Sequence, residues 1–198
     1  MFFGTLRFRL IRAFLLTLFR LLYRFRFRGI ENIPTEGAAI LISNHPSYFD
    51  PMLLYILAPR EIRFLTWDRP FGVPIVGWFL RHCGAIPVNL DTNDGHAFRK
   101  SIKALRQGAL LGIFPEGGRT PKNENLTIKR GTARLASKLQ VPIIPVQILE
   151  NRRIWPPEHR LPHLWGRIEI RILPPLPSPH TETDIQQQIE TLWLPTST

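Results

Sequence analysis

Three apolar runs constrain the fold of this 198-residue chain more than any other feature. They are "AAILISN" at 38–44, "ALLGIF" at 109–114 and "VPIIPVQIL" at 141–149, and none of them alternates between apolar and polar residues. Strands with this pattern are buried on both faces, as in parallel sheets. The chain must therefore supply a covering layer for each side of a sheet.

Helical patterns lie between these apolar runs. Residues 96–108 carry Phe98, Ile102 and Leu105 on one helical face, and residues 131–139 show a second pattern of this kind. Strands and helices thus alternate, which predicts the α/β class: a single domain whose mostly parallel central sheet is flanked by helices. The length and a hydrophobic content of 44% are sufficient for one such core.

Two further segments alternate in the manner of half-exposed strands, "RFRFRG" at 24–29 and "RIEIRIL" at 167–173. The proline-rich segment at 174–179 resembles a stiff linker, and a last helix is expected from about Thr183. We therefore divide the chain into an amphipathic membrane-associating helix, the α/β domain that carries the site, and a linker with a C-terminal helix, at residues 1–23, 24–176 and 177–198.

Most of the formal charge of +11 belongs to the N-terminal residues. The first 30 residues contain seven arginines and no acidic residue, whereas the remainder holds 19 basic and 15 acidic residues. The longest uncharged stretch there, Ala13 to Phe19, would cover only about 10 Å as a helix. A membrane span or a signal peptide is therefore not expected.

On a helical wheel the arginines at 9, 12, 20 and 24 fall within a sector of about 120°, and most phenylalanines and leucines occupy the rest. This pattern is typical of a helix in a membrane interface, where arginine stems reach the headgroups. A helix packed on its own domain is the alternative, but the apolar sector is wide for one small core. We predict binding to an anionic membrane surface and, because the segment is so apolar, no nucleic-acid partner.

The single cysteine, Cys83, excludes an intramolecular disulfide and a zinc site built on several thiolates. The chain therefore suits a reducing compartment, and we expect a peripheral, monotopic protein on the cytoplasmic face of the cell membrane. We predict no cofactor. We also predict no metal site, because the sequence shows no third metal-ligating residue at a characteristic spacing from His45 and Asp50.

The segment "SNHPSYFD" at 43–50 places a histidine and an aspartate five positions apart. In a helix or a strand these two side chains could not touch. Pro51 favours a helix that begins at Asp50, and Pro46 bends the chain directly after His45. We expect the connecting loop to fold back and to bring the imidazole of His45 against the carboxylate of Asp50.

Such a pair can act as a general base, because the carboxylate fixes one ring nitrogen and leaves the other to accept a proton from a hydroxyl. The spacing taken by itself favours a plainer interpretation, in which Asp50 caps a helix and His45 is a turn histidine. A second segment, "GIFPEGGRT" at 112–120, offers glycines that admit a ligand and an arginine fork suited to phosphate. Taken alone, this segment is also compatible with a surface turn.

Together, "NHPSYFD", "FPEGGRT" and "VPIIPV" resemble the glycerolipid acyltransferase family, which includes the 1-acylglycerol-3-phosphate acyltransferases. The resemblance runs from about Phe25 to Val146. It implies an O-acyltransferase that moves an acyl group from acyl-CoA or acyl-carrier protein to the hydroxyl of a lysophospholipid acceptor. A non-catalytic lysolipid-binding module remains the alternative.

The resemblance also implies a role for individual residues. His45 would be the general base and Asp50 its orienting partner, and the substrate would be bound by Glu116, Gly117, Arg119 and Lys129, with Gly131 nearby. Where the family commonly has basic residues, this chain has "FLTWDRPF" and Leu90. We therefore expect a phosphate site with less charge than usual, unless Arg69 or Arg81 compensates, and the identity of the acceptor lipid stays open.

Overall fold

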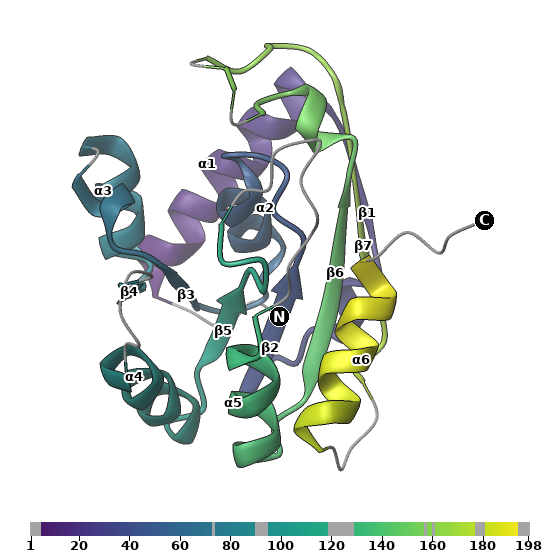
Figure 1. Ribbon diagram of the computed structural model, residues 1–198. Helices are drawn as coiled ribbons and strands as arrows, with labels where there is room; N and C mark the ends of the chain where they lie inside the picture. Colours follow the sequence, from purple (N-terminus) through teal and green to yellow (C-terminus); the bar gives the residue numbers. More distant parts are fainter. Residues whose placement is uncertain are drawn as a thin grey trace.

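The computed structural model describes residues 5–72, 74–89, 95–118, 129–156, 158–159, 161–176 and 181–193 (Figure 1). Within these residues a seven-stranded sheet has the order β1-β7-β6-β2-β5-β3-β4. All neighbouring strands are parallel except β6 and β7. The predicted mostly parallel α/β sheet is thus confirmed. The strands are β1 (Arg24–Arg28), β2 (Ala39–Ser43), β3 (Ile62–Trp67), β4 (Ile86–Val88), β5 (Leu110–Ile113), β6 (Ile143–Leu149) and β7 (Arg167–Ile172).

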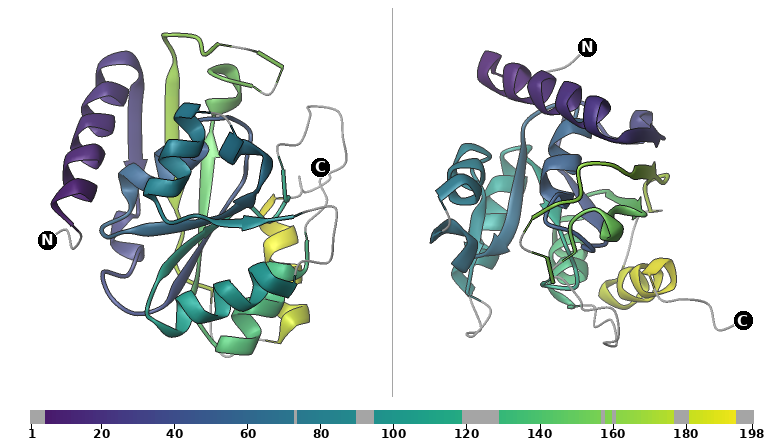
Figure 2. Two further views of the ribbon diagram at one scale, coloured as in Figure 1. Left: turned by 90° about the vertical axis from the view of Figure 1, so that its left-hand side faces the viewer. Right: turned by 90° about the horizontal axis from the view of Figure 1, so that it is seen from above.

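Helices cover both faces of the sheet, as the view from above shows (Figure 2). The described α-helices are α1 (Leu6–Leu22), α2 (Asp50–Leu57), α3 (Pro74–His82), α4 (Gly95–Arg106), α5 (Gly131–Leu139) and α6 (Glu182–Trp193). The described residues also form the short 3-10 turns η1 (Ile30–Asn32), η2 (Arg69–Gly72) and η3 (Asn151–Arg153).

The central strand β2 separates two hydrophobic cores. Ala39 and Leu41 face the core that contains α1 and α2, whereas Ile40 and Ile42 face the core that contains α4, α5 and α6. All residues of β2 are buried, as the uninterrupted apolar run predicted. The sequence reasoning did not identify strands β3 and β4, which extend the sheet beyond β5, or helix α3.

The outer strands β1 and β7 confirm the predicted alternation. Their arginines lie on an exposed face, while Phe25 and Phe27 pair in register with Ile168 and Ile170 on the buried face. The chain turns at Gly29, where φ is +81° and a Cβ atom would lie 2.0 Å from the carbonyl oxygen of Ile172. Only glycine fits this turn.

Helix α1 is apolar on two opposite sides. On the inner side, Phe8 is 1% exposed and packs edge-on against Tyr55 of α2, with ring centroids 4.8 Å apart. On the outer side, the large apolar residues Leu6, Leu10, Phe14 and Leu21 are 61% to 71% exposed. The helix therefore packs on its own domain and still presents an apolar outer face, which we call the outer row of α1. None of the helices within the described residues combines the length and apolar character needed to cross a membrane.

The C-terminal helix α6 begins at Glu182, next to the predicted start at Thr183. Its residues Ile185 and Ile189 are fully buried in the core that also contains Leu135 of α5. This helix therefore completes the cover of one face of the sheet.

The two sides of α1 should differ in their effect on stability. Phe8→Ala removes a buried ring and should lower the free energy of unfolding by about 3–5 kcal/mol. Phe14→Ala makes the same chemical change at a residue that is 66% exposed, and should change the stability by no more than about 0.5 kcal/mol. Urea unfolding followed by circular dichroism measures both variants. Equal effects would show that α1 does not pack as described.

Candidate active site

The loop between β2 and α2 brings His45 and Asp50 together. The Nδ1–H of His45 donates to Oδ2 of Asp50 over 2.8 Å, so the predicted contact is confirmed. The His45 side chain is 15% exposed, whereas the Asp50 side chain is fully buried. Because Nδ1 is bound to the carboxylate, Nε2 is the ring nitrogen left to accept a proton.

Two further groups donate to the carboxylate of Asp50. The backbone N–H of Ser47 donates to Oδ2 over 2.8 Å, and the side-chain amide of Asn151 donates to Oδ1 over 2.5 Å. Helix α2 does begin at Asp50, but its N-cap residue is Phe49 and makes no side-chain capping bond. The interpretation of Asp50 as a helix cap is therefore wrong.

Burial sets the electrostatics of Asp50. Removal from solvent raises the pKa of the carboxyl group, and the hydrogen bonds from His45, Ser47 and Asn151 oppose that rise. A buried carboxylate without such donors would be strongly destabilising. The three donors therefore allow a negative charge to exist behind the imidazole.

Asn44 fixes the start of the same loop. Its side-chain amide donates to the carbonyl oxygen of Ile148 over 2.9 Å, and its Oδ1 accepts the backbone N–H of Ile148 over 2.8 Å. The side chain thus extends the pairing between β2 and β6 beyond the end of β2. His45, the next residue, is held at the carboxyl edge of the parallel strands.

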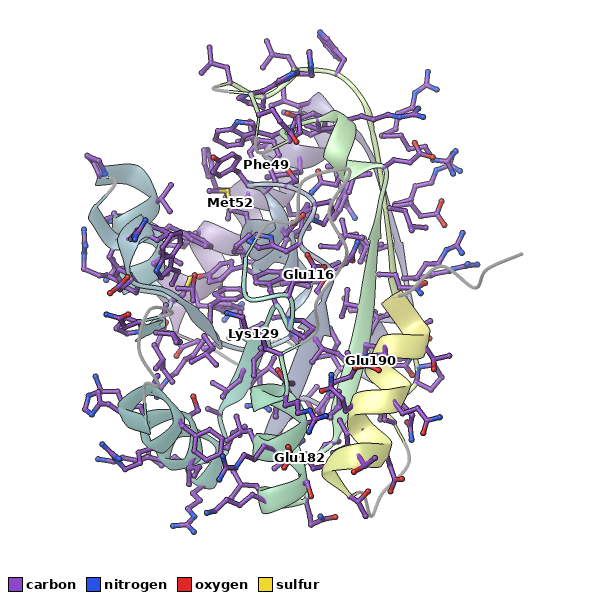
Figure 3. The ribbon with its side chains drawn as sticks, in the orientation of Figure 1. Phe49, Met52, Glu116, Lys129, Glu182 and Glu190 are labelled. Atoms are coloured by element: carbon purple, nitrogen blue, oxygen red, sulfur yellow. The ribbon has the colours of Figure 1, made fainter. Side chains whose placement is uncertain are left out.

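The second predicted segment meets His45 at this edge. Oε1 of Glu116 accepts the backbone N–H of His45 over 3.2 Å. The backbone N–H of Lys129 donates to the carbonyl oxygen of Pro115 over 2.8 Å, and a Cβ atom on Gly117 would lie 2.6 Å from Cε of Lys129. Glu116, Gly117 and Lys129 therefore gather beside the end of β5 (Figure 3). Arg119 and Leu90 lie outside the described residues.

The two arginines considered as substitutes for a missing charge make other contacts. The guanidinium of Arg69 lies over the ring of Trp67, 4.2 Å from its centroid. Nη1 of Arg81 donates to the carbonyl oxygen of Phe71 over 3.0 Å. Gly131 is the first residue of α5 and follows the segment that carries Lys129.

Two residues of the site were missed by the sequence reasoning. Phe114 stacks on the imidazole of His45, with ring centroids 4.0 Å apart and planes 17° apart, and so fixes one face of the ring. Asn151 binds Asp50 from the turn after β6. Both residues follow buried strands at the carboxyl edge, where parallel sheets place their functional groups, and this rule could have indicated them.

A cavity of about 360 Å³ lies away from these residues. It is lined by Tyr55, His82 and Cys83 among others, near the beginning of β3, and the Tyr55 hydroxyl is 3.0 Å from Nε2 of His82. Because β3 is parallel to β5, its beginning lies at the opposite edge of the sheet from His45.

Comparison with known proteins identifies similar chains. The family model described as Acyltransferase matches residues 24–149. The chloroplastic 1-acyl-sn-glycerol-3-phosphate acyltransferase LPAT1 of Arabidopsis thaliana is 28% identical over 137 residues, which cover 68% of this chain and 38% of that protein. The 1-acyl-sn-glycerol-3-phosphate acyltransferase of Bacillus subtilis is 28% identical over 116 residues, which cover 58% of this chain and 57% of that protein. The chain thus matches less than two thirds of the length of these curated relatives.

A solved structure shares the fold. The crystal structure of the 1-acyl-sn-glycerophosphate acyltransferase PlsC from Thermotoga maritima aligns with a TM-score of 0.80 and 25% sequence identity. The alignment covers 93% of this chain and 76% of that chain. The similarity therefore extends from the central sheet to most of the surrounding helices.

The raised pKa of Asp50 predicts a dependence of stability on pH. The folded protein holds this proton more tightly than the unfolded chain, so the contribution of Asp50 to stability is greatest below about pH 4 and is lost as the pH rises through the folded pKa. Asp50→Asn should make the free energy of unfolding fall less steeply with rising pH. Urea unfolding at a series of pH values measures the slope.

Asp68→Asn is the matched control for this experiment, because it makes the same change at an exposed side chain. Its slope should equal that of the parent protein. If Asp50→Asn also kept the slope of the parent, the electrostatic description of the buried carboxyl would be incorrect.

Proposed function

Because the chain belongs to the acyltransferase family, we propose that it transfers an acyl group from an acyl thioester to the hydroxyl of a lysophospholipid. The resemblance seen in the sequence motifs is thereby confirmed at the level of the family. The observation that carries the proposal is the bond between His45 and a fully buried Asp50, beside the Glu116 segment. The named relatives favour 1-acylglycerol-3-phosphate as the acceptor. The donor is an acyl-CoA or an acyl-carrier protein.

His45 acts as the general base in the proposed reaction. Nε2 takes the proton of the acceptor hydroxyl while the oxygen attacks the carbonyl carbon of the thioester. The new C–O bond forms, the C–S bond breaks, and the proton passes from His45 to the departing sulfur. Asp50 holds the ring in the required tautomer and stabilises the imidazolium that forms during the attack.

The Glu116 segment binds the acceptor in this proposal. Arg119 and Lys129 supply positive charge for the phosphate, and Gly117 allows the Lys129 side chain to approach the backbone. Glu116 ties this segment to the backbone of His45, so the phosphate and the general base keep a fixed relation. Such fixed placement of the two substrates is a large part of catalysis for a reaction between two molecules.

The outer row of α1 supports a peripheral location on the membrane. Four large apolar side chains there face outward, and the exposed arginines Arg7, Arg9 and Arg20 lie on the same helix. Each basic residue near an anionic leaflet contributes about 1 kcal/mol. We place the protein on the cytoplasmic face, where lysophospholipid is available in the plane of the membrane. The apolar character of the row disfavours nucleic acid as a partner.

His45→Ala tests the mechanism. The variant should lose acyl transfer by at least about 10²-fold, because the general base is gone. Release of free thiol from acyl-CoA in the presence of 1-acylglycerol-3-phosphate measures the rate. His159→Ala, a change at an exposed histidine, is the matched control and should keep the rate of the parent.

The outcome also separates catalysis from mere binding. Turnover by His45→Ala at the parent rate would rule out the general base. If the parent bound lysolipid but released no thiol from either kind of donor, the protein would be a lysolipid-binding module instead.

Asn151 should act as a positioning residue for Asp50. Asn151→Ala removes a donor from the buried carboxylate, so the pKa of Asp50 should rise further and kcat should fall by about tenfold to a hundredfold. The decline of kcat toward low pH should begin at a higher pH than in the parent, with KM for the acceptor little changed. Arg153→Ala, an exposed change in the same turn, is the control. An unshifted pH profile would leave Asn151 with a structural role alone.

A further inference from the structure

The loop between β6 and β7 presents three large apolar side chains to solvent. Leu161 is 77% exposed, Leu164 is 58% exposed and Trp165 is 77% exposed; we call these three residues the loop patch. Because β6 is parallel to β2, the loop leaves the sheet at the same edge as His45. Figure 1 shows it crossing that end of the molecule.

Hydrogen bonds hold the backbone around the loop patch. The backbone N–H of His163 donates to the carbonyl oxygen of Ile154 over 2.8 Å, and the Tyr23 hydroxyl donates to the carbonyl oxygen of His163 over 3.0 Å. The backbone N–H of Arg24 donates to the carbonyl oxygen of Gly166 over 2.8 Å. The loop patch is therefore presented outward by a fixed backbone, while Ile154 beneath it is 1% exposed.

The base of the loop is packed on the connector that carries His45. The ring of Trp155 lies 5.0 Å from that of Tyr48 and 4.9 Å from that of Phe49, between centroids. The backbone N–H of Tyr48 also donates to the carbonyl oxygen of Trp155 over 3.3 Å. The base of the loop is thus fixed to the connector that carries the reactive histidine.

Arginines line the exposed face of β1 and β7, which begins at the base of the loop. Arg24 and Arg167 are partners in register at the start of β1 and β7, and Arg28 and Arg171 are partners further along the same exposed face. Together with Arg26 this face carries five arginines and a single acid, Glu169. The loop patch is apolar and includes a tryptophan, and the neighbouring face of β1 and β7 is positively charged. This combination is complementary to the anionic interface of a lipid leaflet.

The loop patch lies near the C-terminal end of α1. Leu21, which is 71% exposed, lies in the last turn of α1, two residues before the Tyr23 that holds the loop. The C-terminal end of the outer row therefore lies at the same end of the molecule as the loop patch and His45.

We infer that Leu161, Leu164 and Trp165 insert into the same anionic leaflet as the outer row of α1 and so hold the His45 edge of the sheet against the membrane. This inference rests on the proposed function for its choice of a lipid surface as the partner. The loop patch would be a second point of contact with the membrane. Two points of contact determine the orientation of the domain on the membrane, whereas one determines only that it binds.

Site-specific labelling tests the insertion. Cys83 is 7% exposed and burial raises the pKa of its thiol to about 12, so a maleimide dye should label an added cysteine selectively. Leu164→Cys carries an environment-sensitive dye on the loop patch. Lys138→Cys carries it on α5, near the start of β6 at the opposite edge of the sheet, as the matched control. With vesicles of phosphatidylcholine and phosphatidylglycerol, emission should shift to the blue at position 164 and stay unchanged at position 138.

A triple variant, Leu161→Ser, Leu164→Ser and Trp165→Ser, measures the contribution of the loop patch to binding. Its affinity for the same vesicles should fall at least about tenfold, because three apolar side chains no longer enter the leaflet. Its turnover of a water-soluble, short-chain lysolipid should equal that of the parent, which shows that the site is intact.

The results distinguish this inference from the proposed function. An unshifted emission at position 164, or vesicle binding by the triple variant equal to that of the parent, would overturn the inference and leave the loop patch to a protein partner. A parent protein that turns over no acyl thioester would instead overturn the proposed function. The emission and the vesicle affinity would still decide whether the loop patch enters the leaflet.

Discussion

A carboxylate without access to water must find its hydrogen bonds inside the protein, and Asp50 finds them in three residues from two segments. His45 and Ser47 come from its own loop, and Asn151 comes from the turn beyond β6. The hydrogen bonds that the Asp50 carboxylate requires therefore connect the loop between β2 and α2 to the turn that carries Asn151, which is remote in sequence. The geometry of the imidazole follows from that connection, because the ring can only bind where the carboxylate has been fixed.

Much of the fold could be predicted because its central strands are buried on both faces. The runs that became β2, β5 and β6 contain few polar residues, and a strand of this kind has no other place than the middle of a covered sheet. The contact between His45 and Asp50 was also predictable, since Pro46 and Pro51 exclude a regular helix through the segment. Local sequence patterns indicated both features, and the spacing of His45 and Asp50 alone had left a helix cap and a turn histidine open.

Other features depend on contacts that local patterns do not encode. Strand β4 has three residues, one of them Pro87, and is too short to show a period. Asn151 lies far from Asp50 in sequence, and its role is visible only once β6 is placed beside β2. The wide apolar sector of α1 indicated an amphipathic helix, but only the packing of Phe8 on Tyr55 shows that the sector is divided between a buried and an exposed side. Membrane contact by the exposed side stays a prediction.

The pairing of β1 with β7 has a consequence for synthesis of the chain. Strand β1 lies at the end of the sheet, and its neighbour there is β7, so Arg24 to Arg28 cannot pair until residues 167–172 have left the ribosome. Until then Phe25 and Phe27 lack their partners, whereas the chain from β2 to β6 can already form its own ladder. The nascent protein should thus expose the apolar residues Phe25 and Phe27 until β7 has been synthesised. During this period a chaperone or a nearby bilayer would protect it from aggregation.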